Sequence, residues 1–125
     1  VALYDKLLNI GFSLPIIISS RSYVSSSSEI DKGSIIMHDV IVNSSARIGK
    51  NCIINNKALI EHDVSVGDNN HIATGAIING GVSIGNNCFI GSGAVIKQSV
   101  SIGDNSIVGA GVVLKKNIEA DKTIV

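Results

Sequence analysis

Two histidines near the middle of the chain have side chains suited to acid–base chemistry. His62 stands between Glu61 and Asp63, and His71 follows nine residues later. A carboxylate that accepts a hydrogen bond from one ring nitrogen orients the imidazole and makes the other nitrogen a better proton acceptor. We therefore regard His62 as a candidate general base, oriented by Asp63. The residue types alone leave an alternative equally open, in which Glu61, His62 and Asp63 are polar corner residues in contact with water.

Metal binding is the other common use of histidine. A zinc site shared by His38, His62 and His71 is disfavoured, because the repeat described next places His38 more than one coil away from His62. The chain also has no Gly-rich phosphate loop, no serine-nucleophile motif and no CxxC pair. We predict that the protein binds no metal.

A repeat surrounds these residues and predicts the fold. One short phrase occurs four times at intervals of eighteen residues, at 47–51, 65–69, 83–87 and 101–105. Each period of eighteen residues is divided into three periods of six, because an aliphatic residue stands at every sixth position from 18 to 114. A period of six indicates a parallel β-helix, and three sixes indicate a triangular coil with three short strands and three corners.

The positions next to the aliphatic residues support this interpretation. Strand side chains alternate between faces, so each aliphatic residue and the small residue two positions before it both point inward. Cys52 and Cys88 occupy that small position, two coils apart and roughly 9–10 Å from each other, beyond the reach of a disulfide. We predict two buried, reduced thiols that pack as small hydrophobes. The corners carry Gly and Asn, which adopt positive φ at little cost.

Composition agrees with a solenoid and excludes several function classes. The 125 residues are 45% hydrophobic but only 3% aromatic, which suits coils that pack only on their neighbours. Ten basic and ten acidic residues give a formal net charge of zero, so no basic surface for nucleic acid or anionic lipid is expected. We see no signal peptide and no apolar run near twenty residues, so no membrane association is expected. With reduced thiols, this predicts a cytoplasmic protein.

The repeat divides the chain into three parts. Residues 1–15 precede it, and their apolar residues fall near one helical face, so we expect a short helix that once packed on a segment upstream. Residues 16–116 are expected to form the β-helix. The pattern is lost from Asn117, so residues 117–125 are expected to be a cap or a shortened tail.

The residue before each inward aliphatic points outward and forms one column per face. Face one carries Glu29, Arg47, Ser65, Ser83 and Ser101; face two carries Ile35, Ile53, His71, Phe89 and Ile107; face three carries Tyr23, Ile41, Leu59, Ile77, Val95 and Val113. Two apolar outer faces are unfavourable for a monomer in water. We therefore predict a homotrimer in which face two of one subunit packs against face three of the next, bringing His71 close to the neighbouring His62. The alternatives are a non-specific sticky solenoid and, for His71, an interface histidine with a satisfied hydrogen bond.

The six-residue pattern resembles the bacterial transferase hexapeptide repeat, and three segments narrow the resemblance. Residues 56–63 (NKALIEHD), 70–73 (NHIA) and 80–85 (GGVSIG) are similar to the family of sialic acid O-acetyltransferases and nucleotide-aminosugar N-acetyltransferases. The resemblance implies an all-β fold, a left-handed parallel β-helix of hexapeptide repeats with three strands per 18-residue coil and a short N-terminal helix. It also implies that residues 1–15 are the remnant of a missing Rossmann-like domain.

The same resemblance implies an acetyl-CoA-dependent acyltransferase that works as a trimer with active sites between subunits. His62 matches the family's general base, Asp63 its acidic neighbour, His71 a residue near the acetyl end of the cofactor, and Ser92 and Ala110 the cofactor-binding corners. The expected acceptor is the amino group of a nucleotide-linked sugar in bacterial surface glycan biosynthesis. A sialic acid or polysaccharide hydroxyl is the alternative acceptor, and a non-catalytic trimeric scaffold is the alternative from another class.

Overall fold

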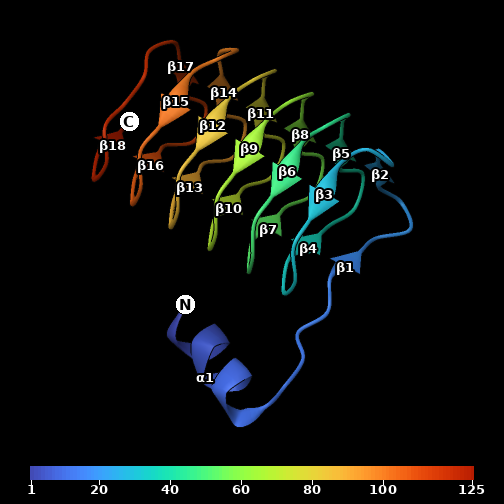
Figure 1. The fold of residues 1–125 in the computed structure, drawn as a ribbon. Helices are drawn as coiled ribbons and strands as arrows, with labels where there is room; N and C mark the ends of the chain where they lie inside the picture. The colour runs from blue at the N-terminus through green and yellow to red at the C-terminus, as the bar shows by residue number, and fades with distance from the viewer.

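The computed structural model describes all 125 residues, in one helix and eighteen two-residue strands. Helix α1 (Ala2–Ile10) confirms the short N-terminal helix and lies outside the coils (Figure 1). It ends at Gly11, whose φ of 104° is the left-handed conformation common at helix C-termini. Tyr4 is the buried residue of α1 and packs on Gly33, where an added Cβ would lie 2.6 Å from the Tyr4 ring. No helix has the length and hydrophobicity of a transmembrane span.

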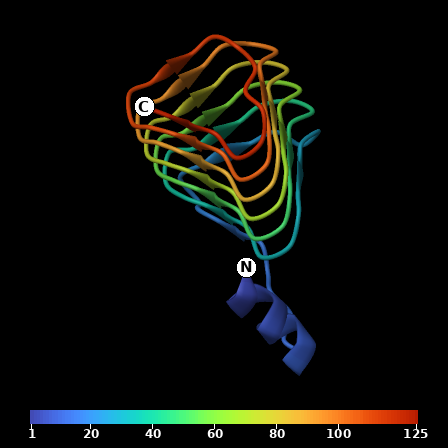
Figure 2. The same ribbon diagram turned by 90° about the vertical axis from the view of Figure 1, so that its left-hand side faces the viewer.

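The strands form three parallel sheets, one on each side of a triangular prism that is seen end-on in Figure 2. Face one consists of β3 (Glu29–Ile30), β6 (Arg47–Ile48), β9 (Ser65–Val66), β12 (Ser83–Ile84) and β15 (Ser101–Ile102). Face two consists of β1 (Ile17–Ile18), β4 (Ile35–Ile36), β7 (Ile53–Ile54), β10 (His71–Ile72), β13 (Phe89–Ile90), β16 (Ile107–Val108) and β18 (Thr123–Ile124). Face three consists of β2 (Tyr23–Val24), β5 (Ile41–Val42), β8 (Leu59–Ile60), β11 (Ile77–Ile78), β14 (Val95–Ile96) and β17 (Val113–Leu114).

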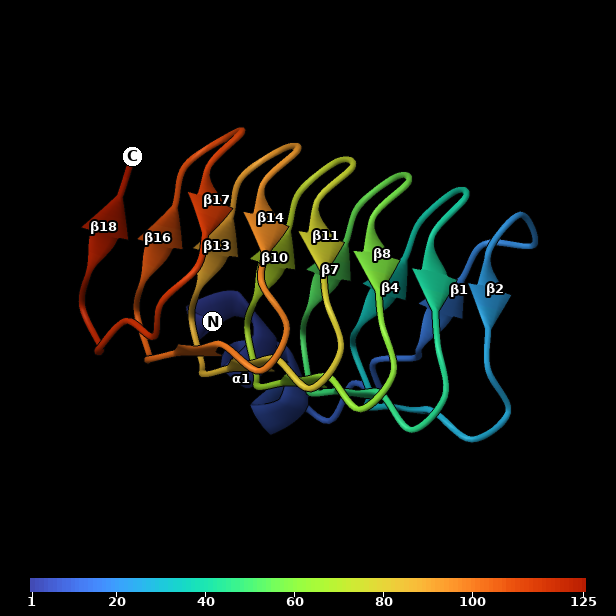
Figure 3. The same cartoon turned by 90° about the horizontal axis from the view of Figure 1, so that it is seen from above.

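The register of these sheets follows the eighteen-residue repeat. Each strand from β1 to β14 pairs with the strand eighteen residues further on, as β10 does with β13 (Figure 3). The predicted parallel β-helix with three strands per 18-residue coil is therefore confirmed. The last coil is two residues shorter: Ile107 pairs with Thr123 and Ile102 with Ile118, sixteen residues apart. This shortening is why the six-residue pattern is lost from Asn117.

The inward aliphatic residues form one continuous core along the prism. Every aliphatic position from Ile36 to Leu114 is buried, whereas Ile18, in the first coil, is exposed because no coil covers it on one side. The outward apolar residues of faces two and three are open to solvent in the single chain, with Tyr23 59% and Phe89 40% exposed. The predicted division into an apolar interior and two apolar outer faces is therefore present.

One inward column is polar, which corrects the interpretation of the two cysteines. Both are free and buried, as predicted, but they are more than small hydrophobes, because each thiol donates to a backbone carbonyl. Along this column each side chain donates a hydrogen bond to the backbone carbonyl fifteen residues later. The four bonds are Ser34 to Gly49 (2.6 Å), Cys52 to Gly67 (3.1 Å), Asn70 to Gly85 (2.7 Å) and Cys88 to Gly103 (3.2 Å). Burial raises the pKa of both thiols above the ordinary 9.0.

The corners depend on two different backbone requirements. One residue in every six from 33 to 111 has φ between 54° and 77°, and these residues include Asp39, Lys57 and Asp63 as well as the expected Gly and Asn. The glycine of the repeated phrase has another role. A Cβ at Gly67 would lie 2.6 Å from the carbonyl oxygen of Gly85, so glycine allows successive coils to approach closely.

Candidate active site

The edge between faces three and one, here the three–one edge, carries the candidate base. It comprises residues 43–45, 61–63, 79–81, 97–99 and 115–117, stacked coil upon coil. Asp63 has a φ of 59°, and its Oδ2 lies 3.0 Å from Nδ1 of His62. A carboxylate accepts only, so in the neutral imidazole Nδ1 is the protonated nitrogen and Nε2 has the free lone pair. Both side chains are more than half exposed, so Nε2 is accessible to a substrate.

Gly80 lies one coil further along this edge and supports the His62 ring. A Cβ at residue 80 would lie 2.6 Å from both Cε1 and Nε2 of His62, so the ring rests directly over the glycine. The backbone N–H of Gly80 donates no hydrogen bond within the chain. In the sequence Gly80 belongs to the segment 80–85 that carries the family resemblance, but no role was predicted for it; its eighteen-residue distance from His62 is the signal that it lies against that histidine. A base nitrogen and an unpaired amide donor therefore lie together on an open edge.

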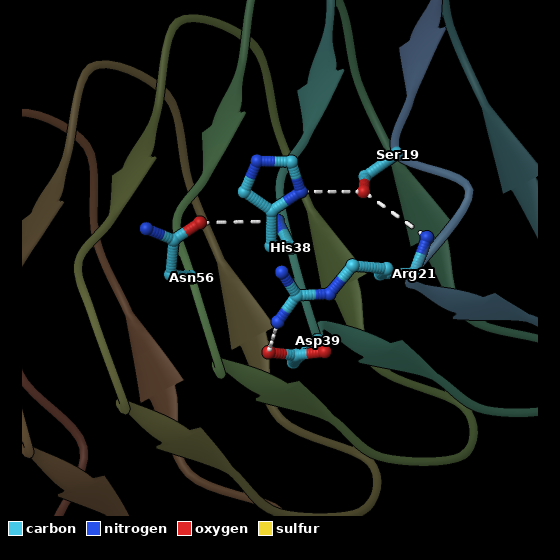
Figure 4. A network of polar contacts seen from close by, with 5 residues as sticks. All are labelled: Ser19, Arg21, His38, Asp39 and Asn56. Carbon is cyan, nitrogen blue, oxygen red and sulfur yellow. Dashed lines mark hydrogen bonds and ion pairs between the residues drawn. The ribbon is translucent and has the colours of Figure 1, made fainter.

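The chain contains a second His-Asp dipeptide that adopts the same turn but makes different contacts. Asp39 also has a φ of about 60°, yet its carboxylate pairs with Arg21 instead of His38 (Figure 4). Nδ1 of His38 lies 2.7 Å from the hydroxyl of Ser19 (Figure 4). His38 and Asp39 thus form no oriented base, and they provide an internal comparison for His62 and Asp63.

His71 lies on face two, in β10, and is half-buried. The side-chain amide of Asn55 lies 3.3 Å from its Nε2, and its ring stands edge-on to Phe89 at a centroid distance of 5.2 Å. These contacts fix the imidazole orientation. They also connect His71 to the edge between faces two and three, where Asn55 begins a corner.

That second edge, here the two–three edge, carries the predicted cofactor-binding corners. Thr74, Ser92 and Ala110 stack one coil apart, because Gly93 N–H donates to Thr74 O (3.0 Å) and Gly111 N–H donates to Ser92 O (2.9 Å). All three are exposed. A Cβ added at Gly93 or Gly111 would meet nothing within 4 Å, so the edge is an open ladder of small residues.

The predicted site residues therefore form two groups within one chain. His62, Asp63 and Gly80 are together on the three–one edge, whereas His71, Ser92 and Ala110 are on face two and the two–three edge. Face three separates the two edges. His38 lies apart from both other histidines, on the two–three edge beside Asn56.

The chain was compared with protein families and solved structures. Residues 45–80 match the family described as bacterial transferase hexapeptide (six repeats), and residues 81–116 match the hexapeptide repeat of succinyl-transferase. Among solved structures it is similar to PerB from Caulobacter crescentus in complex with CoA and GDP-perosamine, with 34% identity over 98% of this chain and a TM-score of 0.96. This chain belongs to the hexapeptide-repeat transferase family. Comparison with curated proteins gave no match.

Two further solved structures are similar to this chain. The acetyltransferase domain of PglB from Neisseria gonorrhoeae, in complex with acetyl coenzyme A, shares 30% identity over 98% of this chain with a TM-score of 0.96. WeeI from Acinetobacter baumannii shares 31% identity over 98% of this chain with a TM-score of 0.93. The chain spans 59% of the length of PerB and 60% of the other two.

Proposed function

We propose that this chain is the acyl-transfer part of an acetyl-CoA-dependent N-acetyltransferase that acts on the amino group of a nucleotide-linked sugar. The observation that carries the proposal is the His62–Asp63 pair on an open edge, with the His62 ring resting over Gly80, whose N–H has no acceptor within the chain. The similarity to PerB, which was solved with CoA and GDP-perosamine, supports the cosubstrate and the class of acceptor. The role in bacterial surface glycan synthesis and the cytoplasmic location stay predictions.

The proposed chemistry is a direct transfer of the acetyl group. The neutral amine of the acceptor attacks the thioester carbonyl carbon, while Nε2 of His62 accepts a proton from that nitrogen. The negative charge that develops on the carbonyl oxygen is stabilised by a backbone N–H, for which Gly80 is the candidate. The tetrahedral intermediate then breaks its carbon–sulfur bond, and the imidazolium returns the proton to the departing thiolate. Asp63 holds Nδ1–H throughout and stabilises the imidazolium.

The position of the two edges supports a site shared between subunits. Subunits related by a rotation axis wind in the same sense, so adjoining faces run in opposite directions. In a trimer the edge shared by the two packed faces lies at the threefold axis. If face two packed against face three, the two–three edges of all three subunits would therefore meet at this axis, far from every His62. Packing face two against face one places the two–three edge of one subunit beside the three–one edge of the next. We propose this second arrangement for a homotrimer in place of the one expected from the apolar columns.

The proposal is tested by acetyl transfer to a nucleotide-linked amino sugar, followed as release of free CoA thiol. His62→Asn should lower kcat by about 10² to 10⁴-fold, the usual contribution of a general base. His38→Asn is the matched control, since it changes the same dipeptide on the same type of turn, and it should keep activity within about twofold. Equal losses in the two variants, or none in either, would contradict the assignment of His62. Acetylation of a sugar hydroxyl but not of the amine would overturn the choice of acceptor.

A further inference from the structure

Three lysines gather at the far end of the edge that carries His62. Lys97 lies two coils beyond Glu61 in the same column, and Lys115 and Lys116 lie on the following coil. All three are exposed, and none forms an ion pair, because the chain's three pairs involve other residues. Three of the eight basic residues that form no ion pair are therefore concentrated at one end of one edge.

A groove lies between two of these lysines and the coil that supports the candidate base. It has a volume of about 580 Å³ and is lined by Asn79, Val95, Lys97, Gln98, Val113 and Lys115. Asn79 is held in place because its side-chain amide donates to the carbonyl of Ile96 (2.9 Å). The next residue, Gly80, supports the His62 ring. The groove thus begins on the coil that supports the His62 ring and runs toward the C-terminal coils.

The charges along this edge are arranged with opposite signs at its two ends. Glu61 and Asp63 flank His62, whereas the corners at 97–99 and 115–117 contain no carboxylate. Glu119, the nearest acidic residue along the chain beyond Lys116, lies at the opposite end of face one, where its carbonyl accepts from Ser106. An anionic group would be attracted to the lysine end and repelled from the histidine end.

The distances match a ligand with a thioester at one end and a phosphate at the other. With a rise of about 4.8 Å per coil, Lys97 lies about 9 Å and Lys115 about 14 Å beyond His62 along the prism axis. The arm of coenzyme A has roughly thirteen bonds between sulfur and the first phosphorus, about the length of four extended residues or ~15 Å. A thioester at His62 therefore places the diphosphate beside the lysines.

We propose that Lys97, Lys115 and Lys116 bind the diphosphate of coenzyme A, so that the subunit supplying the base also holds the charged end of the cosubstrate. This inference rests on the proposed function and assigns cosubstrate binding to an edge other than the one that carries Ser92 and Ala110. Lysine ammonium groups act as point charges on phosphate, which suits side chains that reach from an exposed edge.

The test compares the wild-type chain with a variant carrying Lys97→Gln, Lys115→Gln and Lys116→Gln. A matched control carries Lys6→Gln, Lys32→Gln and Lys50→Gln, which removes the same charge near α1. Three ligands are titrated by calorimetry or assayed for turnover: acetyl-CoA, acetyl-dephospho-CoA and S-acetylpantetheine, which has no phosphate. We expect the first variant to bind both nucleotide thioesters at least tenfold more weakly, with a flatter salt dependence, and to turn over S-acetylpantetheine as the wild type does.

Several results would overturn the inference. Unchanged affinity for acetyl-CoA would show that the lysines are only solvated, and an equal loss of S-acetylpantetheine turnover would show a general structural defect. A loss confined to acetyl-CoA would assign the lysines to the 3′-phosphate instead of the diphosphate. A loss of the same size in the control would show a non-specific charge effect. If the wild type binds no acetyl-CoA, the proposed function fails, and the inference fails with it.

Discussion

Adding a methyl group at Gly80 tests whether catalysis depends on the position of the His62 ring. A Cβ at residue 80 would lie 2.6 Å from Cε1 and Nε2 of His62, whereas optimal contacts between carbon atoms begin near ~3.5 Å. Gly80→Ala must therefore displace the ring by about 1 Å. A misplacement of that size costs about 10²-fold in rate, or about 2.7 kcal/mol of activation free energy.

Stability should hardly change in the same variant. The His62 side chain is 60% exposed, so the ring can move outward without repacking the core. Residue 80 does not have a left-handed φ, so alanine fits its backbone, and the unfolded chain loses some conformational freedom. We therefore expect kcat to fall about 100-fold, while the melting temperature stays the same or rises slightly.

A double-mutant cycle separates the ring from every other effect of the methyl group. Activity is measured as release of CoA thiol for wild type, Gly80→Ala, His62→Ala and the double variant. Without the ring, alanine at residue 80 should cost nothing more, so the two effects should be far from additive. A similar loss on top of His62→Ala, or full activity in Gly80→Ala alone, would refute the reasoning.

Three further predictions concern Asp63 and the two thiols. Asp63→Asn should lower kcat about tenfold with little change in melting temperature, because asparagine tolerates the left-handed φ and an exposed ion pair contributes little stability; a kcat equal to the wild type would contradict the role of Asp63. Cys52→Ser should keep the free energy of unfolding within about 1 kcal/mol of the wild type, because serine can still donate to the carbonyl of Gly67. Cys52→Val should lower it by about 1–3 kcal/mol, because that carbonyl loses its donor. Equal urea midpoints for the two variants would contradict this prediction. Burial raises the pKa of the thiols of Cys52 and Cys88, so the unfolded chain ionises first, and the free energy of unfolding should fall as pH rises above about 9. Urea titrations should show a smaller fall in a Cys52→Ser/Cys88→Ser variant, and an equal fall would exclude the thiols as its cause.

The periodicity predicts most of the fold because each coil obeys the same local rule. A strand exposes one residue outward and one inward, so the aliphatic residue at every sixth position and its small partner fix the faces, the register and the core. Gly and Asn likewise indicate the left-handed position of many corners. Asp39, Lys57 and Asp63 occupy that position too, and their types carry no comparable signal. The helix was predicted from its apolar face.

The site was harder to predict because its contacts join residues a whole coil apart. The dipeptide at His62 and the one at His38 have the same sequence and the same turn, and only the contacts made by each aspartate distinguish them. The glycine of the repeated phrase was predicted only as a corner residue, whereas the structure requires it because the next coil approaches it closely. The hydrogen bond from Cys52 to Gly67 could not be predicted either, because it joins residues on successive coils. Such features depend on neighbours at a distance of fifteen to eighteen residues.

Titration of the chain with acetyl-CoA by calorimetry, beside a determination of its mass in solution, tests the central claim most directly. It requires neither a known acceptor nor any other part of the relatives' length. We predict saturable binding of about one acetyl-CoA per subunit to a trimer. A stable trimer or monomer that binds no acetyl-CoA would contradict the claim that this prism carries an acetyl-transfer site.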